Sequence, residues 1–176
     1  MIGVCDIKGF VPEACEVIQI DGEAEGNGTF DGERFEEWLE DKLLPRLGRY
    51  AFGEPRSVVV MDNASIHHSD RVVELIESVG SIVLYLPPYS PDKNPIEFMF
   101  ATYKAKLKKL GRDHNWLYCH YRALDAVSPD MARNCFRHCG IPLMKPDDDD
   151  RDFTRRIILV TIIIIYIYQF HALQAH

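Results

Sequence analysis

The chain has 176 residues, and 47% of them are hydrophobic. This is enough for one domain with a packed core, and it excludes a globally disordered protein. The formal net charge is −7 at pH 7, which argues against non-specific nucleic-acid binding over the whole surface but leaves room for a local basic strip. Five cysteines form no dense framework and the start carries no secretory signal, so we expect a reducing compartment.

Acidic and basic residues are concentrated in different parts of the chain. Carboxylates crowd residues 21–41 and the run "PDDDDRD" at 146–152. The segment "YKAKLKKLGR" at 103–112 carries five basic residues and no acid. Local charge therefore indicates more about partners than the net charge does.

The first part of the chain predicts two strands and a helix. Residues 1–5 and 14–20 read as strands joined by a polar turn, and an acidic, glycine-rich loop follows. Residues 30–47 read as a helix with Asp31 as its N-cap. Its apolar residues fall at helical spacing: Phe35, Trp38, Leu39, Leu43 and Leu47.

The middle of the chain alternates strands and helices. The continuous apolar run at 57–62 predicts a strand that is buried on both faces. A short helix over 69–80, capped by Ser69, and a second buried strand over 81–86 come next. This alternation, after an antiparallel opening, predicts an α/β domain with a mixed sheet.

A proline-rich loop and a longer helix complete this pattern. Prolines at 87, 88, 91 and 95 remove backbone donors, so residues 87–95 cannot form regular structure. Pro95 suits the first turn of a helix that continues to residue 110. Residues 113–140 read as mostly helical.

The C-terminal part divides into a linker and a tail. Residues 142–156 form an acidic linker, and residues 157–176 begin with "IILVTIIIIYIY". Twelve mostly β-branched residues are too few for a membrane span, which needs about 20. The tail is an added strand, a weak tail anchor, or sequence never selected to fold, and we favour the last interpretation.

Two carboxylates are candidates for a shared metal site. Asp62 ends a buried strand, and Glu97 opens the helix after the proline loop. One helix, one strand and one loop separate them, which is the amount of chain that returns to the same sheet edge. Sites in open α/β sheets lie at the carboxyl ends of strands. Carboxylates there suit Mg²⁺, and two such ions can catalyse phosphoryl transfer if they share a third acid.

The helix that carries Glu97 has two different faces. Glu97, Ala101, Lys104 and Lys108 share one face, while apolar residues form the other. A phosphate backbone beside the metal site would suit the lysines. Each feature also has an ordinary explanation when taken alone: a turn for Asp62, a dipole carboxylate for Glu97 and a solvated face for the lysines.

Two further groups of residues contain side chains of the types that bind metals. Cys135 and Cys139, near His120 and His138, have spacing that fits no closed zinc motif. The pair His67 and His68 favours a structural role or simple exposure. Neither group predicts a metal site.

The motifs "VVVMDNASIHHS" and "YLPPYSPDKNPIE", followed by a lysine on the next helix, resemble the catalytic domain of mariner-like transposases. The resemblance covers residues 1–141 and includes the spacing between the second Asp and the Glu. These transposases belong to the Asp-Asp-Glu (DDE) superfamily, so it implies a ribonuclease H-like fold and the cutting and joining of DNA with two Mg²⁺ or Mn²⁺ ions. It assigns Asp62 and Glu97 as catalytic metal ligands, and the following to the shape of the site: Asn63, His67, Pro88, Tyr89, Ser90, Pro91, Asn94 and Pro95. The assignment of Lys104 and Lys108 to DNA comes from the helix face that they share with Glu97.

The chain departs from the family at its start. The first catalytic Asp belongs on the first strand of the fold, which we expect upstream of Met1 and therefore missing. Asp6 falls in the hairpin turn, at the far end from Asp62, and Asp21 leads into the acidic loop. We therefore predict a truncated catalytic core that is inactive alone.

Alternative functions differ in chemistry. The chain could be a non-catalytic DNA-binding or interaction remnant, an active nuclease that uses Asp6 or Asp21, or a decayed reading frame. The resemblance implies DNA as the partner, a homodimer as in relatives, no small-molecule substrate, no membrane association and a nuclear location.

Overall fold

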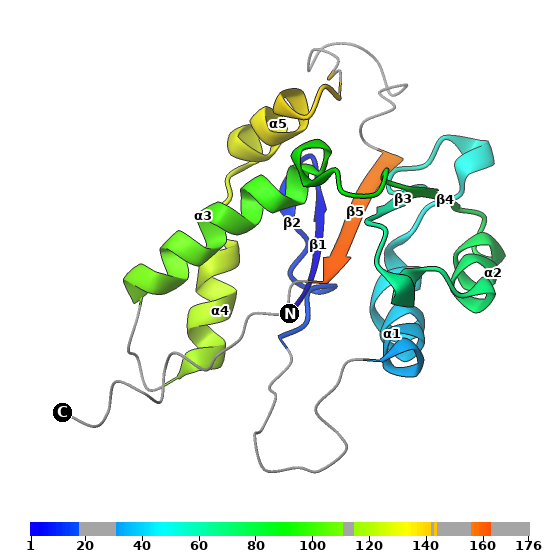
Figure 1. Cartoon of the computed structure of the whole chain (residues 1–176), viewed down its shortest axis with the longest axis horizontal. Coiled ribbons are helices and arrows are strands. Elements are labelled where there is room, and N and C mark those ends of the chain that lie inside the picture. Colours follow the sequence, from blue (N-terminus) through cyan, green and yellow to red (C-terminus); the bar gives the residue numbers. More distant parts are fainter. Residues whose placement is uncertain (18–30, 111–114, 142, 144–155, 163–176) are drawn as a thin grey trace.

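A five-stranded mixed sheet forms the centre of the molecule (Figure 1). The computed structural model describes residues 1–17, 31–110, 115–141, 143 and 156–162. The strand order is β2-β1-β5-β3-β4. The strands are β1 (Ile2–Asp6), β2 (Gly9–Phe10), β3 (Val58–Met61), β4 (Ile82–Tyr85) and β5 (Ile157–Ile162).

Helices flank the sheet on two sides, so the predicted α/β class is confirmed. In Figure 1, α3, α4 and α5 gather beside β1 and β2, while α1 and α2 lie beside β3 and β4. Four of the N-caps are serine, asparagine or aspartate side chains that accept a backbone N–H, as Asp31 does from Arg34 and Ser69 from Val72. The helices are α1 (Gly32–Trp38), α2 (Asp70–Ser78), α3 (Pro95–Leu110), α4 (Trp116–Leu124) and α5 (Pro129–His138).

The helix expected over 30–47 is not one regular α-helix. After α1, the backbone continues as a π-helical turn over Leu39–Leu43 and a 3-10 turn over Leu44–Arg46. Pro45 lies in that last turn and lacks the N–H that a continuing α-helix needs. Leu39 and Leu43 remain fully buried, so the predicted apolar face is kept.

The C-terminal segment supplies the central strand of the sheet. β5 pairs parallel to β3 and antiparallel to β1, so Leu159 lies between Val60 and Cys5. Ile157, Ile158 and Leu159 are at most 5% exposed. Residues 157–162 are therefore the added strand among the three alternatives, and our preference for unfolded sequence is wrong for them.

β5 lies between β1 and β3, where the sheet would otherwise be interrupted. The sequence led us to expect a sheet that lacks its first strand. The structure instead places β5 between the N-terminal hairpin and β3. The sheet thus combines residues from both sides of the acidic linker.

The N-terminal hairpin is shorter than predicted. β1 pairs with the two-residue β2 through Cys5 and Phe10, and the described residues 14–17 of the predicted second strand form no strand of their own. Glu16 forms only an isolated bridge with Ile2, and residues 18–20 lie outside the described part of the chain. Gly9 has φ +122°, a value that L side chains rarely adopt, so this turn suits glycine.

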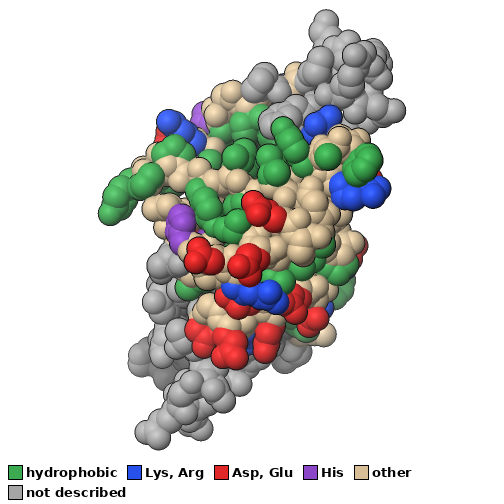
Figure 2. Space-filling model, turned by 90° about the vertical axis from the view of Figure 1, so that its right-hand side faces the viewer, with side chains coloured by type: hydrophobic (Ala, Val, Ile, Leu, Met, Phe, Trp, Pro, Cys, Tyr) green, Lys and Arg blue, Asp and Glu red, His purple; other side chains and the backbone are tan. Residues whose placement is uncertain are grey.

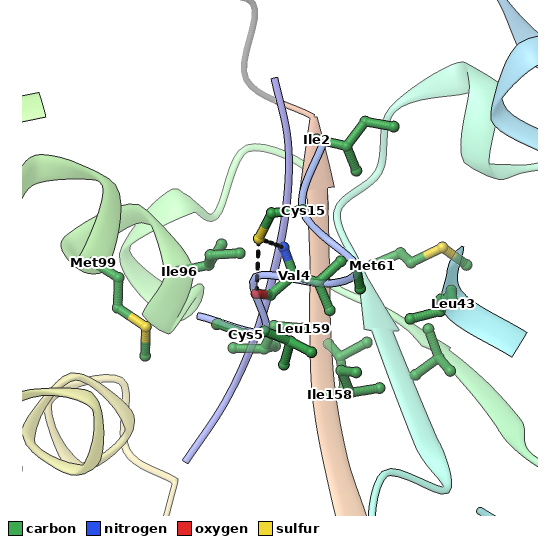
Figure 3. Packing of buried hydrophobic residues seen from close by; sticks show 14 of the residues in the cluster. Ile2, Val4, Cys5, Cys15, Leu43, Met61, Ile96, Met99, Ile158 and Leu159 are labelled. Atoms are coloured by element: carbon green, nitrogen blue, oxygen red, sulfur yellow. Dashed lines mark hydrogen bonds between the residues drawn. The ribbon is translucent and has the colours of Figure 1, made fainter. Parts of the chain in front are cut away.

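The core extends across both faces of the sheet. Figure 3 shows Val4 and Cys5 of β1 and Ile158 and Leu159 of β5 between Ile96 and Met99 of α3 on one side and Met61 and Leu43 on the other. Cys15 Sγ also hydrogen-bonds the backbone of Val4: it accepts the Val4 N–H at 3.4 Å and donates to the Val4 carbonyl at 3.5 Å. The core therefore includes β5 as an integral member.

β4 is an edge strand and not the fully buried strand that we predicted. Its side chains are half-buried, and Leu84 is 47% exposed. Only β3 pairs with it, and an edge position leaves one side of a strand without a sheet neighbour. Separately, within the described residues no helix has the length and apolar character that a membrane crossing requires.

Candidate active site

The two predicted catalytic carboxylates meet in one pocket. Asp62 follows the last residue of β3, and Glu97 lies in the first turn of α3. The pocket has a volume of about 160 Å³, below the roughly 300–1,000 Å³ of pockets that enclose small molecules. Its lining consists of Asp62, Asn63, Leu86, Pro87, Tyr89, Ser90, Pro91, Asn94 and Glu97.

The position of Asp62 follows from the end of the β3–β4 pairing. The Leu86 N–H donates to the Met61 carbonyl at 2.8 Å, which carries the pairing one step past β4. The chain then turns, and the Asp62 carboxylate accepts the Ala64 N–H at 3.2 Å. The side chain of Asp62 keeps 32% exposure, so it is held in place and still reaches the pocket.

His67 supports Asp62 from the protein interior. Its Nδ1 lies 2.9 Å from Asp62 Oδ1 and 3.1 Å from the Asp62 carbonyl oxygen. Both oxygens only accept, so Nδ1 must carry the proton and donate. The ring is 0% exposed and packs against Phe35, with centroids 4.9 Å apart. His67 therefore lies behind the pocket, not in its lining.

A second set of contacts holds the neighbouring residues. His68 Nε2 lies 2.7 Å from the Asn63 side-chain oxygen, and the His68 ring stacks on Tyr85. The Tyr85 hydroxyl donates to the His67 carbonyl at 2.6 Å. The loop after β3 is thus fixed by both histidines and by the last residue of β4.

The surroundings of Glu97 disfavour its charged form. Burial raises the pKa of this carboxyl, and nearby Asp62 adds to the rise, while Lys104 opposes it. The interaction with Asp62 shows that the two carboxylates act on each other electrostatically. A bound cation between them would remove this repulsion.

The proline loop forms the wall of the pocket opposite β3. Pro91–Lys93 form a 3-10 turn, and the Asn94 N–H donates to the Pro91 carbonyl at 3.1 Å. The Asn94 side chain is buried, and its oxygen accepts the Ile96 N–H at 3.4 Å. Pro95 begins α3 and is also buried.

At the tip of this loop, Tyr89 lies between Pro88 and Ser90. The Ser90 hydroxyl donates to the Pro88 carbonyl at 3.2 Å. Tyr89 has φ +54° and is fully exposed. Pro88 itself is not part of the pocket lining.

The two lysines assigned to DNA lie outside the pocket on α3. Lys104 and Lys108 are exposed, while Met99, Phe100 and Tyr103 on the same helix are buried. The two-faced helix expected from the sequence is therefore present. Lys104 is near enough to affect the pKa of Glu97.

The other candidate acids do not reach this pocket. Asp6 pairs with Arg56 at 2.9 Å, and Arg56 precedes β3, at the end of the strand opposite to Asp62. Asp21 lies outside the described residues. In the described part of the chain, no group of three or more His, Cys, Asp or Glu residues is placed to hold a metal ion, and this includes the cysteines and histidines near residue 138.

Three residues of the site were not identified from the sequence. Leu86 and Pro87 line the pocket, and His68 holds Asn63. Leu86 ends the strand predicted over 81–86 and Pro87 directly follows it, and this position was a usable signal. The contact of His68 depends on a turn whose geometry no local pattern indicates.

One known protein family matches the part of the chain that forms this pocket. The family described as DDE superfamily endonuclease matches residues 24–115, which is just over half of the chain. No curated protein matches. The matched range includes both carboxylates and the whole proline loop.

Two solved structures are similar to the chain. One is the Mos1 transposase catalytic domain with raltegravir and Mg, at 18% identity and a TM-score of 0.45, covering 82% of this chain and 77% of that one. The other is the catalytic domain of Mos1 mariner transposase, at 21% identity and a TM-score of 0.40, covering 82% and 76%. On the family match, the chain belongs to the DDE superfamily endonucleases.

Proposed function

We propose that this chain is a DDE-type transposase core whose pocket binds a divalent cation and a phosphate of DNA. The observation that carries the proposal is the meeting of Asp62 and Glu97 in one small pocket. They come from separate elements, and both motifs around them lie inside the family match.

The residues of the pocket suit one hard cation. Mg²⁺ binds through one or two carboxylates and completes its shell with water and phosphate oxygens. Asp62 and Glu97 would hold it. Burial raises the pKa of Glu97 and the Asp62 carboxylate adds to that rise, and a bound ion would balance the charge of both groups. When bound, such an ion polarises a phosphate and lowers the pKa of its water.

The same residues do not suit two ions. Two adjacent ions need a shared carboxylate, and the described residues offer no third acid at this pocket. We therefore propose that the chain binds DNA but does not cut it alone. The two-metal chemistry that the family resemblance implies would therefore be incomplete here.

The chain's own residues would have separate tasks. His67 orients the Asp62 carboxylate, and the proline loop limits the pocket to an ion and a phosphate. Lys104 and Lys108 attract the DNA backbone beside Glu97. With the ion and the phosphate in the pocket, the bases would lie outside it.

The distribution of charge supports an approach of DNA from α3. Figure 2 shows acidic side chains gathered over one part of the side that carries α1 and α2. The exposed acids of these helices and the turn after α1 are Glu33, Glu37, Glu40, Asp41, Asp70, Glu74 and Glu77. This surface would repel DNA, whereas the exposed lysines of α3 would attract it.

A nicking and strand-transfer assay with Mn²⁺ tests the proposed inactivity. We expect no product from the purified chain, together with DNA binding that weakens as salt rises. Cleavage that disappears in Asp62→Ala would overturn the inactivity. Cleavage lost in Asp6→Asn would favour the nuclease that uses Asp6.

A gain-of-function variant addresses the missing acid directly. Met61 pairs with Val160, and continuing this register by one residue would bring the backbone of Thr161 in β5 beside that of Asp62. Thr161→Asp should add a second Mn²⁺ and restore nicking, while Ser78→Asp on exposed α2 should do neither. Failure of Thr161→Asp in a folded protein would show that the missing acid is not what blocks cleavage.

The exposed lysines favour one other function, a DNA-binding module without catalysis. It predicts that DNA binding persists in Glu97→Ala, with or without cation. It also predicts that binding is lost in Lys104→Ala/Lys108→Ala. A strong dependence of DNA affinity on both Glu97 and Mn²⁺ would exclude this function.

A further inference from the structure

Tyr89 combines two locally unfavourable features at the rim of the pocket. Its side chain is 102% exposed, and its backbone has φ +54°. A turn residue with positive φ is usually glycine or asparagine. A large aromatic ring in this conformation, with no burial to offset it, is stable only because the rest of the loop imposes it.

The surrounding loop imposes that conformation with several contacts. Pro88 comes directly before Tyr89, and the Ser90 hydroxyl donates to the Pro88 carbonyl. The Ser90 carbonyl then accepts the Lys93 N–H at 3.1 Å. The tip is therefore a braced turn that projects one ring into solvent.

The ring lies where a DNA base would be if a phosphate entered the pocket. Tyr89 lines the same pocket as Asp62 and Glu97. With a cation and a phosphate inside the pocket of about 160 Å³, the base next to that phosphate would lie at the rim. Exposed aromatic rings beside a phosphate site are the usual platforms on which unpaired bases stack.

We propose that Tyr89 is a stacking platform for an unpaired base next to the phosphate held at Asp62 and Glu97. This inference rests on the proposed function, because it requires DNA at the pocket. It adds a preference for DNA with a single-stranded end over blunt duplex. The strained backbone is retained because the side chain is needed there.

The test compares affinity with stability in three variants. Tyr89→Gly removes the ring and also relieves the positive φ, so it should be at least as stable as the original protein. It should nevertheless bind a duplex with a 3′ single-stranded overhang roughly tenfold more weakly. Tyr89→Trp should bind that DNA at least as tightly as the original. Phe52→Ala removes another exposed aromatic ring (71% exposed), which does not line the pocket. This control should leave the affinity unchanged.

Abasic DNA makes the test specific for stacking. Fluorescence anisotropy at fixed salt, with Ca²⁺ as a non-catalytic cation, would measure the affinity for overhangs with and without bases. Removing the bases should weaken binding of the original protein and leave Tyr89→Gly unaffected.

The outcomes separate this inference from the proposed function. If the original protein and Tyr89→Gly bind the overhang equally well, the stacking role is wrong and the DNA-binding core stands. If the original protein binds no DNA even at low salt, the proposed function is wrong and the stacking role is excluded with it.

Discussion

At the residue scale, Asp62 depends on a histidine that the solvent does not reach. His67 Nδ1 donates to the carboxylate and to the carbonyl of Asp62, and the ring is fully buried. Buried partners that orient metal-binding side chains usually matter nearly as much as the ligands. The position of Asp62 should therefore respond to changes at His67.

Replacing His67 tests this support. His67→Leu removes the donor and should weaken Mn²⁺ binding by about tenfold or more. His67→Asn places an amide N–H near the former Nδ1 and should retain most of the affinity. Calorimetric titration of both variants, after circular dichroism shows that they are folded, measures the difference. Equal loss in the two would assign His67 a packing role only.

A second prediction concerns the packing of Gly3 in β1 against Phe100 in α3. A Cβ at Gly3 would overlap with Cζ of Phe100, whose ring is fully buried. Gly3→Ala should therefore lower the free energy of unfolding by about 1–3 kcal/mol. Gly32→Ala is the control, since nothing lies within 4 Å of its Cβ. Urea unfolding that shows equal stability for both would contradict the packing.

Sequence reasoning identified the two carboxylates of the pocket, and the family resemblance pointed to His67, but the contacts that hold them could not be predicted. Asp62 and Glu97 follow from strand burial, chain length and the proline motif, all of which are local signals. The contact between His67 and Asp62 depends on the turn after β3 and on Phe35 packing behind it. Pro88, predicted to shape the site, does not line the pocket, and its carbonyl accepts the Ser90 hydroxyl in the turn at Tyr89.

At the element scale, β5 is the strand on which the sheet depends most. It lies between β1 and β3, and three of its side chains are buried. The sequence pattern alone could not distinguish an added strand from an unfolded tail, because a run of β-branched residues is compatible with both. Partner strands far away in the chain decide the matter.

Ile158 tests whether β5 is part of the core. Ile158 is 0% exposed, so Ile158→Asp buries an uncompensated charge and should cost more than about 4 kcal/mol. We expect the variant to lose its cooperative thermal transition. Leu117→Asp, on the exposed face of α4, should change stability by at most about 0.5 kcal/mol. A normal transition in Ile158→Asp would show that the tail is dispensable.

The contact between α3 and α4 predicts a dependence on pH. The buried Tyr103 hydroxyl hydrogen-bonds His120 Nδ1, and burial lowers the pKa of His120 from 6.5 to about 4. The fold therefore favours neutral His120. This contribution to stability is complete above about pH 6.5 and is lost as the pH falls toward 4.

His120→Gln keeps a side-chain acceptor for Tyr103 and removes the titrating group. Between pH 6.5 and 4, its free energy of unfolding should decline less steeply than that of the original protein. Chemical denaturation at several pH values measures both slopes. Identical slopes would show that His120 does not titrate between the folded and unfolded states in this range.

At the scale of the whole molecule, the distribution of charged side chains favours an approach of DNA from the side of α3. The acidic surface lies over α1 and α2 (Figure 2), and the exposed lysines lie on α3 beside the pocket. The sequence predicted this separation because acid and base occupy different segments. It could not predict the size of the pocket that Asp62 and Glu97 share, or the position of the Tyr89 ring at its rim. Both depend on how the proline loop packs.

The central claim is that Asp62 and Glu97 together hold one divalent cation. Titration of the full chain with Mn²⁺, followed by calorimetry or electron paramagnetic resonance, tests it most directly. We predict one ion per chain, with binding lost in Asp62→Asn and in Glu97→Gln and unchanged in Asp125→Asn, which alters an exposed acid on a distant helix end. Tight binding of two ions, or binding that survives both site variants, would contradict the account.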